Sequence, residues 1–171
     1  MYTRILLSIL LMLPMLANAE EVEIDGLWYN LSPKEKTAEV IQYKDTRYAG
    51  DVVIPATVTY KDVEYSVTSI AGSAFHWCKD LTSITIGDNV KRIENNAFRS
   101  CNSLTTSTIP SSVTTVGSQA FLDCNLLNAV NITDLGAWNR ILFFDWSSNP
   151  LAYARHLYLN GEEAKGKVKS E

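Results

Sequence analysis

The hydrophobic positions in the middle of the chain recur at one constant interval, which predicts a stack of similar structural units. The motif A-F-x-x-C occurs three times, and the apolar residues around it keep the same register. The strongest columns are Phe75, Phe98 and Phe121; Cys78, Cys101 and Cys124; and Leu81, Leu104 and Leu127. A period of about 20 to 29 residues is typical of solenoids with one short parallel strand per coil. Because parallel strands lie about 4.8 Å apart, each repeated side chain should pack on its counterpart and form a core ladder.

Each unit also contains the pattern L-x-x-I-x-I, in which apolar and polar residues alternate as they do along a strand with one buried face. In LTSITI, Leu81, Ile84 and Ile86 are expected to point inward. The outward positions form our candidate binding face, which is small, neutral and rich in hydroxyl groups: Ser83, Thr85, Thr106, Thr108 and Asn131. Ser107 holds an inward position that is Ile84 and Val130 in the neighbouring units. We expect a packing defect of about 1 to 3 kcal/mol there unless its hydroxyl finds a backbone partner.

The segments on either side of the repeats have their own patterns. Before the repeats, LWYNL, TAEVIQY, VVIPATVTY and EYSVTSI are predicted strands, the last two joined by a tight turn at Lys61-Asp62. After the repeats, Asp134 can cap a short helix whose apolar stripe covers the last coil and consists of Leu135, Trp138 and either Ile141 or Leu142. A second helix is predicted from Pro150 to about Arg155, capped by Asn149. HLYLNGEE then predicts a hairpin that turns at Asn160-Gly161.

The first nineteen residues read as a secretory signal peptide. Arg4 precedes an apolar run at 5–16, and Ala17 and Ala19 form an A-x-A pattern, so cleavage is expected after Ala19. The alternative is a membrane anchor, but this run has twelve residues and is broken by Pro14, whereas a span needs about 20. The expected location is therefore the medium, the periplasm or the cell surface, with no membrane span after cleavage.

Charge excludes one class of partner. The chain has 15 basic and 19 acidic residues and a net charge of −4. Ten of the acids, against five bases, lie in residues 20–66. A nucleic-acid-binding protein needs a basic stripe, and this sequence has none, so we expect no nucleic-acid partner.

The repeated unit V-x-x-I-x-x-x-A-F-x-x-C-x-x-L-x-x-I-x-I resembles the BspA-like leucine-rich repeats of secreted and surface proteins from gut and oral bacteria. Residues 25–31 and 50–70 resemble the family's leading β segment, and 147–163 its recurrent segment between arrays. The resemblance implies a mainly β, short, right-handed leucine-rich-repeat solenoid. We divide the chain into a signal peptide (1–19), an N-terminal β cap (20–66), an array of three 23-residue repeats (67–134) and a C-terminal helical and hairpin segment (135–171). In the family that last segment leads into further repeats, so the chain resembles a truncated or unusually short member.

The stretch SAFHWC contains the residues that most suggest chemistry, because a thiolate beside an imidazole can be a nucleophile or half of a metal site. The register argues against this. Cys78 belongs to a ladder, whereas the counterparts of His76 are Arg99 and Leu122, so no imidazole recurs. Three buried, reduced thiols are the favoured interpretation; one disulfide, or a metal-binding or reactive thiol, remains the alternative. His156 is interpreted as a surface residue.

Other catalytic patterns are missing from the sequence, so we expect no enzyme, no metal and no cofactor. Asp88, Glu94 and Asp123 are expected in turns as solvated acids. Three tryptophans allow two interpretations: Trp77, Trp138 and Trp146. Packing in the core or cap is favoured, and a sugar-stacking platform is the alternative.

The family resemblance implies a non-enzymatic protein-binding or adhesion module. The implied partners are host extracellular-matrix proteins or other cell-surface proteins. A structural spacer or degenerate fragment of a longer repeat protein is the first alternative, and a glycan-binding or glycan-active protein is the second.

Overall fold

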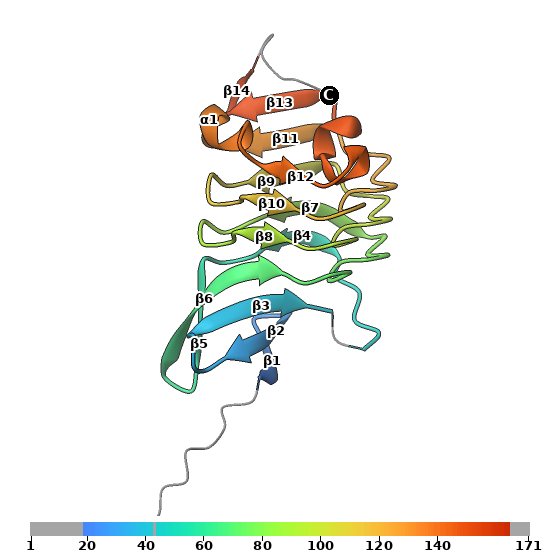
Figure 1. The fold of residues 1–171 in the computed structure, drawn as a ribbon. Coiled ribbons are helices and arrows are strands. Elements are labelled where there is room, and N and C mark those ends of the chain that lie inside the picture. Colours follow the sequence, from blue (N-terminus) through green and yellow to red (C-terminus); the bar gives the residue numbers. More distant parts are fainter. Residues whose placement is uncertain (1–18, 43, 165–171) are drawn as a thin grey trace, which may run out of the picture.

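The computed structural model describes residues 19–42 and 44–164, which form a β-solenoid of about five turns (Figure 1). The predicted fold class is therefore confirmed. The signal segment, apart from Ala19, and the tail at 165–171 lie outside the described residues.

Two sheets run along the solenoid. One has the order β1-β2-β3-β6-β8-β10-β12, with β5 also paired to β6. Its strands are β1 (Glu20–Ile24), β2 (Leu27–Ser32), β3 (Thr37–Ile41), β5 (Thr57–Tyr60), β6 (Val63–Ile70), β8 (Arg92–Ile93), β10 (Thr115–Val116) and β12 (Leu142–Phe143). The other has the order β14-β13-β11-β9-β7-β4. Its strands are β4 (Gly50–Val53), β7 (Leu81–Thr85), β9 (Thr106–Ile109), β11 (Ala129–Ile132), β13 (His156–Leu159) and β14 (Glu162–Glu163).

The repeated side chains fill the space between the sheets as ladders. The ring of Phe98 stacks on those of Phe75 and Phe121, with 5.1 Å between centroids in each pair. Tyr48 extends this ladder by one coil, since its ring lies 4.8 Å from that of Phe75. All three cysteines are buried and unpaired. At about 1.5 to 3 kcal/mol for each fully buried apolar side chain, these ladders make the main contribution to the core.

The turns between coils share one backbone conformation. Two positions in each coil have positive φ, although no glycine occupies either: Ser73, Asn96 and Gln119 at the first, and Trp77, Ser100 and Asp123 at the second. The peptide N–H groups there donate to the next coil, as Trp77 does to the carbonyl of Arg99 at 3.0 Å. Trp77 therefore belongs to the repeat through its backbone, although its side chain has no counterpart.

The segment before the array has strands in both sheets. β1, β2 and β3 pair antiparallel, and β3 pairs parallel with β6. The β5–β6 turn holds Lys61 and Asp62 at φ 49° and 61°, values that two-residue hairpins usually give to glycine or asparagine. β4 does not join this group, because it pairs parallel with β7. It therefore extends the strand-lined sheet of the array by one strand.

The C-terminal helices are shorter than the sequence predicts. Helix α1 (Leu135–Trp138) is a single turn, capped by the Asp134 carboxylate, which accepts from the N–H of Ala137 at 2.6 Å. The second predicted helix is only a 3-10 turn at Pro150–Ala152, so our prediction that it reaches Arg155 is wrong. The N–H of Arg155 instead donates to the carbonyl of Asn128, which aligns the following residues as β13.

The remaining C-terminal elements are the 3-10 turn Trp146–Ser148 and the β13–β14 hairpin. Asn160 and Gly161 turn that hairpin with φ 51° and 86°, as predicted. The structure also decides between the two residues proposed for the apolar stripe, since Ile141 is buried and Leu142 is exposed.

Candidate functional site

The candidate binding face is the outer side of the sheet formed by β4, β7, β9, β11 and β13. Strand pairing aligns its residues in two columns. One column runs Asp51, Ser83, Thr106, Ala129 and His156, and the other runs Val53, Thr85, Thr108, Asn131 and Tyr158. All five predicted face residues thus lie side by side on adjacent strands. Their side chains present hydroxyl, methyl and amide groups.

Four residues of these columns were missed by the sequence reasoning: Asp51, Val53, His156 and Tyr158. The repeat has one constant step, which leads from Ser83 to Thr106 and from there to Ala129. His156 lies further than that step from its neighbour Ala129, and Asp51 lies further than it from Ser83. The alternation of inward and outward side chains in VVI before Pro55 and in HLYL could have located β4 and β13. It could not have given the register in which these strands pair with the array. The face is therefore longer than predicted, and its ends are chemically different from its middle.

At one end of the face, Asp51 carries a negative charge held by hydroxyl groups. Its Oδ1 accepts from the Ser83 hydroxyl at 2.7 Å and from the Thr82 hydroxyl at 2.8 Å. These two hydrogen bonds, from Ser83 first and then Thr82, lower the pKa of Asp51. The carboxylate is therefore ionised at neutral pH, and two protein donors fix its position.

At the other end, β13 and β14 place aromatic and charged groups together. His156 Nδ1 lies 2.6 Å from Glu163 Oε1, and the His156 and Tyr158 rings are 6.2 Å apart. His156 has no cysteine partner, and it is part of the strand-lined face. The side chains at this end can both donate and accept hydrogen bonds, whereas the Asp51 carboxylate at the other end can only accept them.

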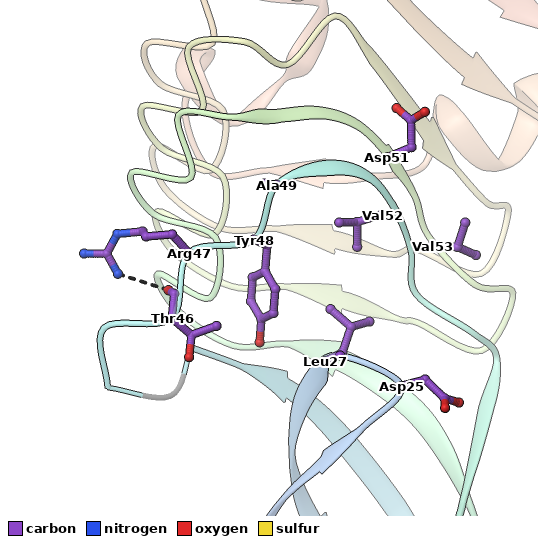
Figure 2. Close-up of a pocket in the computed structure, with 10 residues that line it drawn as sticks. Asp25, Leu27, Thr46, Arg47, Tyr48, Ala49, Asp51, Val52 and Val53 are labelled. Carbon is purple, nitrogen blue, oxygen red and sulfur yellow. Dashed lines mark hydrogen bonds between the residues drawn. The ribbon is translucent and has the colours of Figure 1, made fainter.

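A pocket of about 310 Å³ opens beside β4, where the array meets the β1–β2 turn (Figure 2). Leu27, Tyr48 and Val52 supply apolar walls, and Asp25 and Asp51 supply carboxylates. Arg47 also lines the pocket but points away from both carboxylates, and its Nη1 donates to the carbonyl of Thr46 at 3.1 Å (Figure 2). The Tyr48 hydroxyl is already engaged, since it donates to Ile41 O at 2.8 Å and accepts from Trp28 N at 3.1 Å.

Within SAFHWC, Cys78 is fully buried in the core, whereas His76 is half-buried and Trp77 is exposed. Burial raises the pKa of the Cys78 thiol, and it raises that of Cys124 to about 12. Burial first, and then the positive charges of Arg99 and Arg47, lower the pKa of His76. A neutral thiol in the core and an imidazole turned toward the surface lack the ionised sulfur that nucleophilic or metal chemistry needs.

The other sequence candidates are also dispersed. Glu94 pairs with Arg92 at 3.0 Å, and Asp123 Oδ2 lies 3.4 Å from the Ser100 hydroxyl. Trp138 is buried against Phe143, so it cannot be part of an exposed sugar platform. In the part of the chain that the structure describes, no three His, Cys, Asp or Glu side chains are grouped so that they could hold a metal ion.

Residues 56–145 match the family described as "BspA type Leucine rich repeat region", in six copies. The chain belongs to this family. The matched range includes all members of the phenylalanine, cysteine and leucine ladders. Family and fold are those of leucine-rich repeat proteins, which are generally non-enzymatic and typically secreted or exposed at the surface.

Solved structures support the same assignment. A leucine-rich repeat protein from Bacteroides ovatus is 32% identical, with a TM-score of 0.58 over 71% of this chain and 33% of its own. One from Bacteroides capillosus is 25% identical, with a TM-score of 0.61 over 81% of this chain and 97% of its own. A leucine rich cell surface protein from Faecalibacterium prausnitzii is 23% identical, with a TM-score of 0.55 over 84% of this chain and 44% of its own, and shows the shared fold.

This BspA-type chain thus spans about a third of the length of the B. ovatus protein. No curated protein matches it. Among the described residues, no helix is long and apolar enough to cross a bilayer.

Proposed function

We propose that this chain is a secreted or cell-surface protein that binds another macromolecule, without catalysis, through the outer face of β7, β9 and β11. The proposal rests on one observation above all. Five strands align two columns of outward side chains, and the ladders beneath them hold that surface rigid. A preorganised surface loses little conformational entropy on binding, which favours affinity.

The chemistry of the face favours a protein partner. Thr85, Thr106 and Thr108 present small groups that both donate and accept hydrogen bonds, and they leave the backbone of an approaching partner close access. Adhesion to host extracellular-matrix or other cell-surface proteins is the role that we propose for this face. The signal-like segment at 1–19 and the surface-type family support an extracellular location.

The test is surface plasmon resonance against a panel of purified extracellular-matrix proteins, with serum albumin as the negative control. Combined substitution of Thr85, Thr106 and Thr108 with lysine should reduce the affinity for any bound matrix protein at least tenfold, because three charges would be buried at the interface. The matched control adds three lysines elsewhere on the surface, at Ser111, Asn125 and Asn139, which are exposed.

Three outcomes separate the hypotheses. Loss of binding in the face variant alone supports the proposal. Equal affinity of both variants would place the contact elsewhere. Absence of binding to the whole panel by the unmodified protein would favour a structural spacer.

A further inference from the structure

The edge of the strand-lined sheet at β4 differs from the opposite edge, where the β13–β14 hairpin ends the sheet. β4 is the last strand of its sheet among the described residues. The N–H of Gly50 donates to the carbonyl of Asp80, and that of Ile54 donates to the carbonyl of Thr85, each at 2.8 Å. Because every second residue of a strand bonds to the same side, Asp51 and Val53 turn their N–H and C=O groups to the free edge.

The free edge of β4 is accessible and adjoins the pocket. Val53 is 64% exposed. The pocket extends from β4 to the β1–β2 turn, where Asp25 and Gly26 have φ 50° and 82° (Figure 2). Its volume of about 310 Å³ is at the lower end of ligand pockets, which suits a short extended segment rather than a folded element.

The charges around this edge select the kind of segment. Figure 2 shows Asp51 and Asp25 at opposite ends of the pocket, with Val53 between them, and Arg47 pointing away from both. Asp51 and Val53 also begin the two outward columns of the face. A residue paired with Asp51 on an added strand would have its Cβ about 4.5 to 5.5 Å from that of Asp51, within reach of a lysine or arginine charge.

We propose that β4 binds an extended, basic segment of a protein partner as an additional strand, with lysine or arginine side chains of that segment attracted to the carboxylates of Asp51 and Asp25. This inference rests on the proposed function, because it assumes a protein partner and specifies the segment of that partner that β4 would bind. Backbone hydrogen bonds to Asp51 and Val53 supply affinity, and the two carboxylates supply selectivity. Val52 and Leu27 form the apolar floor under the alternate side chains of the segment.

The probe is the fluorescein-labelled peptide Thr-Val-Thr-Val-Lys-Val-Thr-Val-Thr, with binding measured by fluorescence anisotropy. Two matched peptides carry glutamate in place of lysine, or N-methyl groups on alternate amides. The lysine peptide should bind at least tenfold more tightly than either. No binding of the lysine peptide at millimolar protein, or equal binding of the glutamate peptide, overturns the proposal.

Two substitutions at one position test the backbone pairing. Val53→Pro removes the N–H that faces the free edge and leaves every hydrogen bond to β7 in place. Sheets tolerate proline at such edge positions. Val53→Thr changes the side chain but keeps that N–H. Peptide affinity should fall at least tenfold in Val53→Pro and less than threefold in Val53→Thr, and equal affinities would refute the pairing. Amide hydrogen exchange is the check that needs no variant: bound peptide should slow exchange at residues 51 and 53 at least tenfold, and unchanged rates there would also refute it.

Asp25→Asn and Asp51→Asn test the charge, and each should weaken the lysine peptide severalfold while leaving the glutamate peptide no weaker. An equal loss for both peptides would contradict the role of the carboxylates. The peptide assay is also independent of the matrix-protein panel. If the three-lysine face variant keeps its matrix partner while Val53→Pro loses the peptide, the proposed face is wrong and the strand-addition site stands.

Discussion

The thiol of Cys101 donates a hydrogen bond to the carbonyl oxygen of Phe75, one coil away, with 3.1 Å between sulfur and oxygen. Cys124 repeats the contact with Phe98 at 3.2 Å. Cys101 and Cys124 are therefore small buried side chains that also give a carbonyl of the neighbouring coil a second hydrogen bond, in addition to the one it accepts from a backbone N–H. The contacts give these thiols a structural role that needs no disulfide.

The thiols should react only when the protein unfolds. Burial raises the pKa of Cys78, Cys101 and Cys124, and a neutral, inaccessible thiol reacts slowly. In the native protein, labelling with a maleimide should be at least a hundredfold slower than in denaturant, and mass spectrometry after digestion locates the label. Rapid native labelling of Cys78 alone would reopen the idea of a reactive site at SAFHWC.

Replacing Ser107 should stabilise the protein. Its side chain is fully buried between Ile84 and Val130, and its hydroxyl has no hydrogen-bond partner among the described residues. Ser107→Val removes an unsatisfied hydroxyl and restores an aliphatic contact, so the free energy of unfolding should rise by about 1 to 3 kcal/mol in urea denaturation. Thr106→Val, on the outer side of the same strand, is the control and should change stability by less than about 0.5 kcal/mol. A loss of stability in Ser107→Val would show that the site is too tight for a second methyl group.

The middle ring of the aromatic ladder should matter most. Phe98 stacks on both Phe75 and Phe121, so Phe98→Ala leaves a cavity with two unsupported rings. The expected cost is about 3 to 5 kcal/mol in the free energy of unfolding, measured by chemical denaturation. Leu126, which is 59% exposed, provides the control, since Leu126→Ala should be nearly neutral. Similar losses in both variants would argue against a continuous ladder.

Asp145 should make stability depend on acid pH. Burial by itself raises its pKa, but hydrogen bonds from the Ser118 and Ser147 hydroxyls and from the N–H groups of Gln119 and Ser148 outweigh burial and lower it. A lowered folded pKa stabilises the native state fully above the ordinary value of about 3.9, and this stabilisation is lost as pH falls through the folded pKa.

Thermal unfolding between about pH 2 and pH 7 checks this effect of Asp145. Asp145→Asn should lower the melting temperature at pH 7, and its deficit relative to the unmodified protein should shrink below about pH 4. Asp88→Asn, at an exposed turn position, should follow the unmodified protein throughout. A deficit in Asp145→Asn that is constant with pH would indicate loss of shape complementarity rather than loss of charge.

The ends of the solenoid show where sequence reasoning stops. The constant step of the repeat located the ladders of Phe98 and Cys101, because side chains in a regular stack must recur at the same interval. It could not find Tyr48, whose ring packs against that of Phe75 at a tilt, because Tyr48 lies more than one repeat step upstream of Phe75. Nor could the apolar stripe choose between Ile141 and Leu142, since α1 ends at Trp138 and helical spacing does not apply to the residues after it.

By itself, the sequence determined the period, the core ladders and the outward alternation of Ser83 and Thr85, because these follow from local spacing repeated in register. Only the tertiary structure decided that β4 pairs with β7 and that β13 pairs with β11. Those pairings join segments at irregular separations, and their register depends on backbone hydrogen bonds between coils. The same pairings lengthen the candidate face, leave one edge of β4 free and place Asp51 beside the pocket with Asp25.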